Sequence, residues 1–273
     1  MSILTLKLTR SANVPLDLSP LLPERLAGMT LDAIARIKLD AGADRVEVGE
    51  IFKCSGQPGE QLRLSHLTNA CYRLGAGMTG GAIEARGCFG AELGREMSGG
   101  IITFNGDVGD AAGVGMRGGL MRINGHVGDR LGGPTPGATR GMNGGTILVS
   151  KSAGIATAQR MRRGLISISG ACGASAAERM IAGTLMVFGD CAAQPGLGMR
   201  RGTLMLANPT SPPSNVFNDC GTFELAFVPT FINYLKTIDP LIARHTRPFL
   251  RTRRWAGDLA HGGKGEILVP EPE

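Results

Sequence analysis

The sequence contains few of the residues that mark several common functions. Only 4% of its 273 residues are aromatic, and its six cysteines include no C-x-x-C pair and no histidine at zinc-finger spacing. These shortages disfavour a base-stacking nucleic-acid surface and a structural zinc site. No stretch approaches the roughly 20 apolar residues of a membrane span, and residues 1–10 lack the apolar core of a signal peptide. We therefore expect a cytoplasmic protein with no nucleic-acid or membrane partner.

Methionine and glycine, by contrast, recur in a fixed order. Seven methionines follow one another at steps of 19, 19, 26, 19, 19 and 19 residues, and each is followed three residues later by a glycine. Alternating apolar residues come next, as in Ile102 and Phe104, which predicts one short strand per repeat with one face turned inward. A repeat this short buries its apolar face only against its neighbours. The methionines are Met78, Met97, Met116, Met142, Met161, Met180 and Met199.

This pattern predicts an all-β core. Several glycines per repeat disfavour helices, since each costs a helix about 1 kcal/mol. We expect a right-handed parallel β-helix of about seven 19-residue coils, each with strand, corner, strand and corner. The methionines would form an internal column of flexible apolar side chains, an interpretation strongly favoured over a metal-binding thioether row. Cys172 and Cys191 share one repeat position, so they should stack as buried thiols.

The flanks divide the chain into three expected domains: a small α/β cap over residues 1–58, the β-helix over 59–207, and a C-terminal helix and extended tail over 208–273. In the cap we expect a strand at Ile3–Lys7, a helix at Leu31–Leu39 capped by Thr30, and a strand at Arg45–Cys54. An imperfect first coil should run over Gly59–Gly77. Beyond the core, a helix is expected at Thr230–His245, interrupted at Pro240.

Two segments are candidates for contacts with other chains. The step of 26 residues contains Gly132-Gly-Pro-Thr-Pro-Gly-Ala-Thr, which cannot continue a strand ladder and should leave the core as a loop. It would meet a partner or be a tolerated insertion. The tail holds Trp255, the only tryptophan, in a basic run, and reads equally well as a solvated terminus or an interface anchor. The basic residues are Arg247, Arg251, Arg253 and Arg254.

Two further patterns are candidates for chemistry. The repeat places Asp107 beside His126, and Asp110 beside Asp129, which resembles an acid–base site. We favour the plainer interpretation as polar corner sequences, because no nucleophile or metal motif converges there. The second pattern is an arginine stripe near the methionines, which with a net charge of +6 points to an anionic partner. The stripe comprises Arg95, Arg117, Arg140, Arg160, Arg162, Arg163, Arg179, Arg200 and Arg201.

The repeat Met-x-x-Gly-x-Ile-x-Val-x-Gly-x-x-Gly, clearest in Met97–Gly109, Met116–Gly128 and Met161–Gly173, resembles a known family. It is similar to the G-x-x-G-x-x-x-G β-helix shared by the C-terminal domain of the glutamate synthase large subunit and the C subunit of formylmethanofuran dehydrogenase. The flanking segments Val46–Phe52 and Gly263–Ile267 extend the likeness to this C subunit over nearly the whole chain. Lys151 departs from the pattern, because it replaces a repeat glycine.

The resemblance implies a non-catalytic structural subunit of a formyltransferase/hydrolase complex. Such a complex transfers formyl from formyl-tetrahydromethanopterin to a methanofuran-type carrier and releases formate, in the one-carbon metabolism of formaldehyde oxidation. Its partners would be hydrolase-like, dehydrogenase-like and formyltransferase subunits, and no catalytic site or tightly bound cofactor is expected here. The carrier's glutamate-rich tail would bind Arg162, Arg163, Arg200 and Arg201.

Two alternatives stay open. One is the C subunit of a tungsten or molybdenum formylmethanofuran dehydrogenase in methanogenesis; arginine outnumbers lysine 23 to 6, which favours the bacterial complex instead. The other is a stand-alone polyanion-binding β-helix module. A β-helix acyltransferase is opposed by the 19-residue period, because those enzymes use 18.

Overall fold

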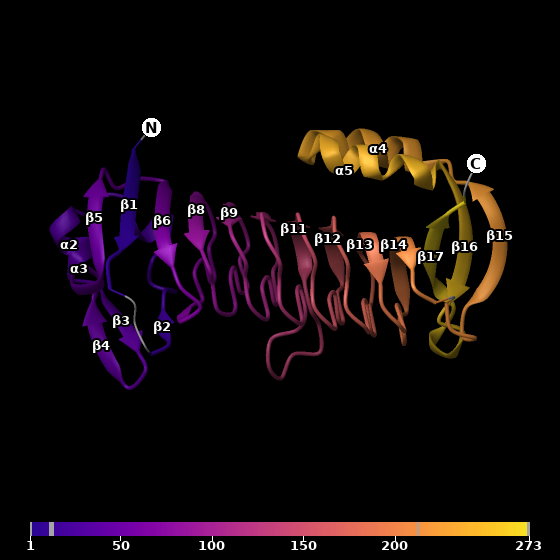
Figure 1. Ribbon diagram of the computed structural model, residues 1–273, viewed down its shortest axis with the longest axis horizontal. Coiled ribbons are helices and arrows are strands. Elements are labelled where there is room, and N and C mark those ends of the chain that lie inside the picture. The colour runs from indigo at the N-terminus through magenta and orange to yellow at the C-terminus, as the bar shows by residue number, and fades with distance from the viewer. Residues whose placement is uncertain (1, 11–13, 212, 272–273) are drawn as a thin grey trace.

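The computed structural model describes residues 2–10, 14–211 and 213–271, which extend along one long axis (Figure 1). In this part of the chain, a large sheet of 13 strands dominates. Its parallel strands, in spatial order, are β1 (Ile3–Leu8), β6 (Gln61–Leu67), β8 (Ala82–Gly87), β9 (Ile101–Asn105), β10 (Leu120–Ile123), β11 (Asn143–Val149), β12 (Arg163–Ile168), β13 (Thr184–Cys191), β14 (Arg201–Pro209) and β17 (Lys264–Pro270).

Antiparallel strands lie at both ends of this sheet. β5 (Phe52–Gly56) pairs with β1, while β16 (Arg251–Gly257) and β15 (Asn218–Glu224) follow β17. Each repeat supplies one strand, and equivalent residues pair in register, as in Ile83 with Ile102 and Ile102 with Met121. The predicted strand of each repeat is therefore confirmed, including the first, imperfect repeat in β6, where Leu62 and Leu64 are buried.

Methionine and glycine recur together because they pack on each other. All seven repeat methionines are completely buried. The methyl group of Met78 lies against Gly100 of the next repeat, so that a Cβ at Gly100 would stand 2.6 Å from Met78 Cε. Gly119 stands in the same relation to Met97, at 2.7 Å. Only glycine leaves room for the preceding methionine, and its φ of +81° at Gly100 is a left-handed conformation that glycine adopts without strain.

The prediction of a right-handed parallel β-helix of about seven 19-residue coils is wrong. The structure builds one large, mostly parallel mixed sheet and a separate sheet of four strands, β4 (Asp44–Glu47), β3 (Lys38–Ala41), β2 (Leu16–Asp17) and β7 (Cys71–Tyr72). The expected second strand of each repeat is reduced to single bridges, such as Phe89 with Val108 and Cys172 with Cys191. The reason is local: left-handed residues such as Glu92 and Gly94 turn the chain too often for a second strand.

The N-terminal elements match the expected cap in part. β1 and the Thr30 cap are confirmed, since the Thr30 hydroxyl accepts the Ala33 N–H at 3.2 Å. However, α2 (Leu31–Ala35) ends four residues early, because Leu39 and Ala41 alternate into β3. The strand expected at Arg45–Cys54 is split into β4 and β5 by a short helix, α3 (Val48–Ile51). A further short helix, α1 (Pro23–Leu26), begins at a proline.

At the C-terminal end, the expected interrupted helix is confirmed as α4 (Phe227–Ile238) and α5 (Pro240–His245), separated by Asp239. The 3₁₀ turn η1 (Arg247–Leu250) leads into β16, and η2 (Leu259–His261) joins β16 to β17. The basic tail is thus not a solvated terminus: Trp255 pairs with Ile267 within the sheet, and Arg254 Nε lies 2.9 Å from Glu266 Oε2. One core cluster extends from Leu4 to Ile267, and the three-domain division stays a prediction.

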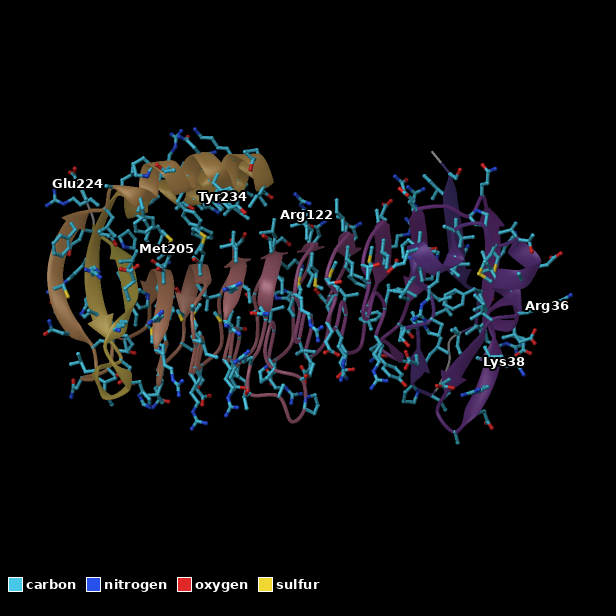
Figure 2. All side chains as sticks on the ribbon, turned by 180° about the vertical axis from the view of Figure 1, so that it is seen from behind. Arg36, Lys38, Arg122, Met205, Glu224 and Tyr234 are labelled. Atoms are coloured by element: carbon cyan, nitrogen blue, oxygen red, sulfur yellow. The ribbon has the colours of Figure 1, made fainter. Side chains whose placement is uncertain are left out.

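Helices α4 and α5 lie over one half of the sheet's outer face, above β11 to β14 (Figure 1). The row of outward residues beneath them is buried and, apart from Ser167, apolar: Leu148, Met186, Met205 and Leu268 pack against Val228, Ile232 and Phe249. In the uncovered half, the same register row continues as Arg122, Thr103, Glu84 and Arg63. Arg122 marks the boundary, because its Nη2 donates to the Ile238 carbonyl at the end of α4, 2.8 Å away (Figure 2).

Candidate anion-binding groove and partner surfaces

The carboxylates of the candidate acid–base group bind the backbone. Asp107 Oδ1 accepts the His126 N–H at 2.8 Å, and Asp110 Oδ1 accepts the Asp129 N–H at 2.9 Å. Asp129 repeats this contact with the Ile155 N–H at 2.9 Å, across the 26-residue step. Each acid joins one repeat corner to the next. This arrangement supports the interpretation as repeated corner sequences.

The repeat cysteines also have a structural place. Cys172 and Cys191 are buried and bridge neighbouring repeats, as predicted. Burial raises the pKa of the Cys172 thiol to about 11 and that of Cys191 to about 12. Both therefore stay protonated at neutral pH, and thiols in that state are poor nucleophiles and metal ligands. Within the described residues, His, Cys, Asp and Glu side chains form no group of three that would hold a metal ion.

The arginine stripe divides into two parts with different partners. In the N-terminal part, carboxylates neutralise the guanidinium groups: Arg95 Nη1 lies 2.9 Å from Glu92 Oε1, and Arg117 Nη2 lies 3.1 Å from Glu96 Oε1. Arg73 binds Glu92 at 2.8 Å. Although burial alone would raise the pKa of Glu92, hydrogen bonds from Arg73 and Arg95 outweigh it and lower that pKa. This part carries little net charge.

In the C-terminal part, arginines surround a groove of about 520 Å³. The groove is lined by the arginines Arg140, Arg160, Arg179 and Arg200, together with His261. Glu178 Oε1 lies 3.6 Å from Arg179 Nε. Throughout the described ranges, no carboxylate forms an ion pair with Arg140, Arg160 or Arg200. A concave surface with this excess of positive charge attracts anions.

Of the four arginines predicted to bind the carrier, only Arg200 lines this groove. Arg163 and Arg201 begin β12 and β14, and Arg162 directly follows Met161. Ile181 stands between Arg162 and Arg200 in the repeat, so the four form two separate pairs rather than a continuous row. Sequence reasoning placed Arg140, Arg160 and Arg179 in the stripe but did not single them out. Nothing in the sequence pattern pointed to His261, because it belongs to η2, outside the repeats.

The loop predicted within the 26-residue step leaves the sheet between β10 and β11 (Figure 1). Its base is closed by the Met142 N–H, which donates to the Gly132 carbonyl at 2.8 Å. The Gly141 N–H donates to the Arg160 carbonyl, also at 2.8 Å. These bonds hold Arg140 beside the repeat corners, so the loop forms one wall of the groove.

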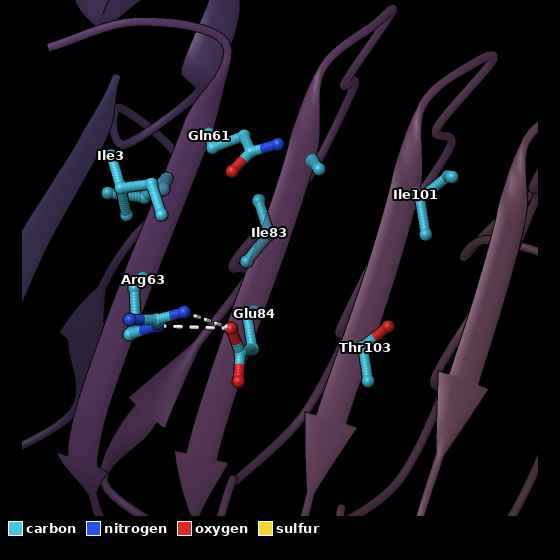
Figure 3. A pocket seen from close by; sticks show the side chains of 9 residues that line it. Ile3, Gln61, Arg63, Ile83, Glu84, Ile101 and Thr103 are labelled. Atoms are coloured by element: carbon cyan, nitrogen blue, oxygen red, sulfur yellow. Dashed lines mark hydrogen bonds and ion pairs between the residues drawn. The ribbon is translucent and has the colours of Figure 1, made fainter. Parts of the chain in front are cut away.

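The outer face offers two further surfaces. A shallow hollow of about 260 Å³ crosses the uncovered half of the sheet, where Ile101 is 44% exposed and Arg63 Nη2 binds Glu84 Oε2 at 2.9 Å (Figure 3). On α4, Phe227 and Tyr234 are exposed, and Phe231 lies between them with ring centroids 6.5 and 6.3 Å away. No helix in the described ranges is long and apolar enough to cross a membrane.

These features define a repeat protein with a mostly parallel sheet, a cationic groove and exposed apolar surfaces. No family model and no curated protein matches the chain. A solved structure does: the X-ray structure of the formyltransferase/hydrolase complex FhcABCD from Methylorubrum extorquens, with methylofuran, contains a chain of 34% sequence identity. The TM-score is 0.92, and the match covers 98% of this chain and 100% of that chain. The chain therefore belongs to the family of that component of the formyltransferase/hydrolase complex.

Proposed function

We propose that this chain is a component of a formyltransferase/hydrolase complex, equivalent to its C subunit, and that it acts as a non-catalytic scaffold. The observation that carries this proposal is the full-length similarity to a chain of such a complex, at 34% identity. The complex would move formyl from formyl-tetrahydromethanopterin to a methanofuran-type carrier and release formate in one-carbon metabolism. The formyl chemistry would lie on the partner subunits.

Two features of the chain agree with a scaffold role. The aspartates at the repeat corners hold the backbone of the next repeat, as Asp110 does for Asp129. Apolar side chains are exposed on α4 and α5: Phe227 is 44% exposed, Tyr234 53% and Leu241 54%. Exposed apolar surface of this kind is typical of an interaction site. The loop over residues 132–139 is a second candidate contact.

Purification of the native complex through a tag on this chain tests the proposal. We expect hydrolase-like, dehydrogenase-like and formyltransferase subunits to co-purify, with formate release by the complex and none by the isolated chain. Tungsten or molybdenum in the purified complex would instead favour the formylmethanofuran dehydrogenase alternative. Recovery of the chain without companions would contradict the proposal.

We also propose that Arg162, Arg163, Arg200 and Arg201 hold the acidic tail of the carrier in the complex. All four are at least partly exposed, and one repeat separates the two pairs, a spacing of about 10 Å that suits a flexible polyanion. Replacing all four by glutamine should raise the KM for the carrier and leave turnover of a tail-less analogue unchanged. An equal response of both carriers would contradict this assignment.

A further inference from the structure

The groove is assembled from three separate parts of the chain. Arg140 comes from the loop between β10 and β11, Arg160, Arg179 and Arg200 come from successive repeat corners, and His261 comes from η2 near the C-terminus. A periodic sequence alone would produce an open row of arginines on one face. Here the inserted loop and the C-terminal turn add walls that the repeat does not encode.

Gly198, which has no side chain, forms the floor of the groove. Arg160 directly precedes Met161 and Arg179 directly precedes Met180, but Gly198 precedes Met199. Gly198 lines the groove, and a Cβ there would stand 3.1 Å from Arg179 Cγ. A side chain at this position would therefore crowd Arg179 in the groove.

The His261 wall is fixed by a buried carboxylate. Asp258 is only 1% exposed, and its Oδ2 accepts the Gly198 N–H at 3.0 Å while lying 3.3 Å from His261 Nδ1. Its Oδ1 accepts the Ala260 N–H at 2.8 Å. These bonds tie the C-terminal turn to the floor of the groove. The carboxylate oxygens of Asp258 contact these groups. The guanidinium groups of Arg140, Arg160 and Arg200 have no carboxylate partner among the described residues.

We propose that this groove binds a small anion carrying two or more phosphate or carboxylate groups. Guanidinium groups bind both oxyanions through paired N–H donors, and several around one hollow favour a ligand with more than one such group. The volume of about 520 Å³ exceeds what a single phosphate would fill. The groove shares Arg200 with the carrier surface proposed above, but the binding inferred here requires neither the carrier nor assembly into a complex.

Calorimetric titration of the full-length chain at about 50 mM salt tests this inference, because screening is still weak there. The probes are pyrophosphate, propane-1,2,3-tricarboxylate and orthophosphate. We expect at least one of the first two to bind about tenfold more tightly than orthophosphate. A preference between them identifies phosphate or carboxylate as the natural group. Replacing Arg160 and Arg179 by glutamine should weaken that binding at least about tenfold.

A matched control keeps the test specific. Replacing Arg244 and Arg247, two exposed arginines outside the groove, by glutamine removes the same charge and should change the Kd less than about twofold. Equal weakening by both pairs would show a diffuse positive field and overturn the inference, as would the absence of binding by any probe. Unchanged thermal unfolding of both variants confirms that they are folded. Failure of the chain to assemble with partners leaves this titration unaffected, so the two proposals fail separately.

Discussion

The two halves of the repeat array, residues 61–123 and 143–206, have the same inner face and different outer faces. Inside, both halves bury the same kinds of residue at equal repeat positions, such as Ile102 and Ile166. Outside, one register row changes from Arg63, Glu84, Thr103 and Arg122 in the first half to Leu148, Ser167, Met186 and Met205 in the second. Helices α4 and α5 cover the second half and reach the first half only at its last strand, β10, through Leu120 and Arg122 (Figure 1).

The corners of the repeats differ in the same way. Arginines of the first half are neutralised by glutamates, as Arg117 is by Glu96. Arg160 and Arg200 in the second half, and Arg140 in the loop before it, lack such partners within the described residues. The comparison teaches that stacking constrains the inward positions, the glycines that admit methionine and the corner residues that contact the next repeat, such as Asp110. The other outward and corner positions are free to vary, so the two halves have different surfaces.

The largest expected effect comes from deletions, because parallel pairing requires whole repeats. Deleting residues 97–106 should abolish cooperative unfolding, since it removes Met97 and the strand β9 but leaves the rest of that repeat without a strand to pair. Deleting residues 97–115 or 161–179, one full 19-residue repeat each, should leave a soluble protein. The second deletion should lower the Tm more, because it removes Leu165 from beneath α4 and α5. Equal loss of folding in all three variants would contradict the register argument.

The second largest effect is expected from a lysine placed in the outward register row, which should destabilise the covered half far more than the uncovered half. Met205 is completely buried beneath the helices, so Met205→Lys should lower the free energy of unfolding by about 4 kcal/mol. Thr103→Lys, in the same row of the uncovered half, should change it by less than about 0.5 kcal/mol. Urea unfolding measures both. Similar losses in the free energy of unfolding for both variants would mean that the helices do not shield the second half from solvent.

The packing of methionine on glycine predicts a smaller effect, common to both halves. Gly100→Ala should cost about 2 kcal/mol, because the new Cβ meets Met78 Cε at 2.6 Å and the Gly81 carbonyl oxygen at 2.8 Å at a positive φ. Gly80→Ala is the control, since nothing lies within 4 Å of its Cβ position. It should change stability by less than about 0.5 kcal/mol. If Gly100→Ala leaves stability unchanged, packing against methionine does not explain the glycine found three residues after each repeat methionine.

The smallest expected effect concerns the ion pair of the uncovered half. Arg63 and Glu84 side chains are 48% and 53% exposed, so a double-mutant cycle with alanine should give a coupling energy of about 0.5 kcal/mol or less. High salt should reduce it further. A coupling above about 2 kcal/mol would indicate that this surface is more strongly desolvated than its exposure implies.

The sequence predicted much of the local structure because that structure follows from short-range patterns. Alternation gave the strands β8 to β14, Thr30 gave a helix cap, and the prolines and glycines of residues 132–139 gave a loop. The expected second strand of each repeat was wrong, because a residue such as Glu92 adopts a left-handed conformation that its identity does not disclose. Of the two readings of the basic tail, the solvated terminus was wrong, since β16 and β17 extend the sheet from β14, whereas the interface anchor stays a prediction.

The sequence by itself determined the repeat, its inward residues and the pairing of methionine with glycine, because these depend on residue size and on a period of 19. Tertiary structure alone decided which half is covered and where positive charge collects. Arg140, Gly198 and His261 are distant in the chain and follow no common pattern. They line one groove because the closed loop and the buried Asp258 carboxylate bring their backbones to the same repeat corners.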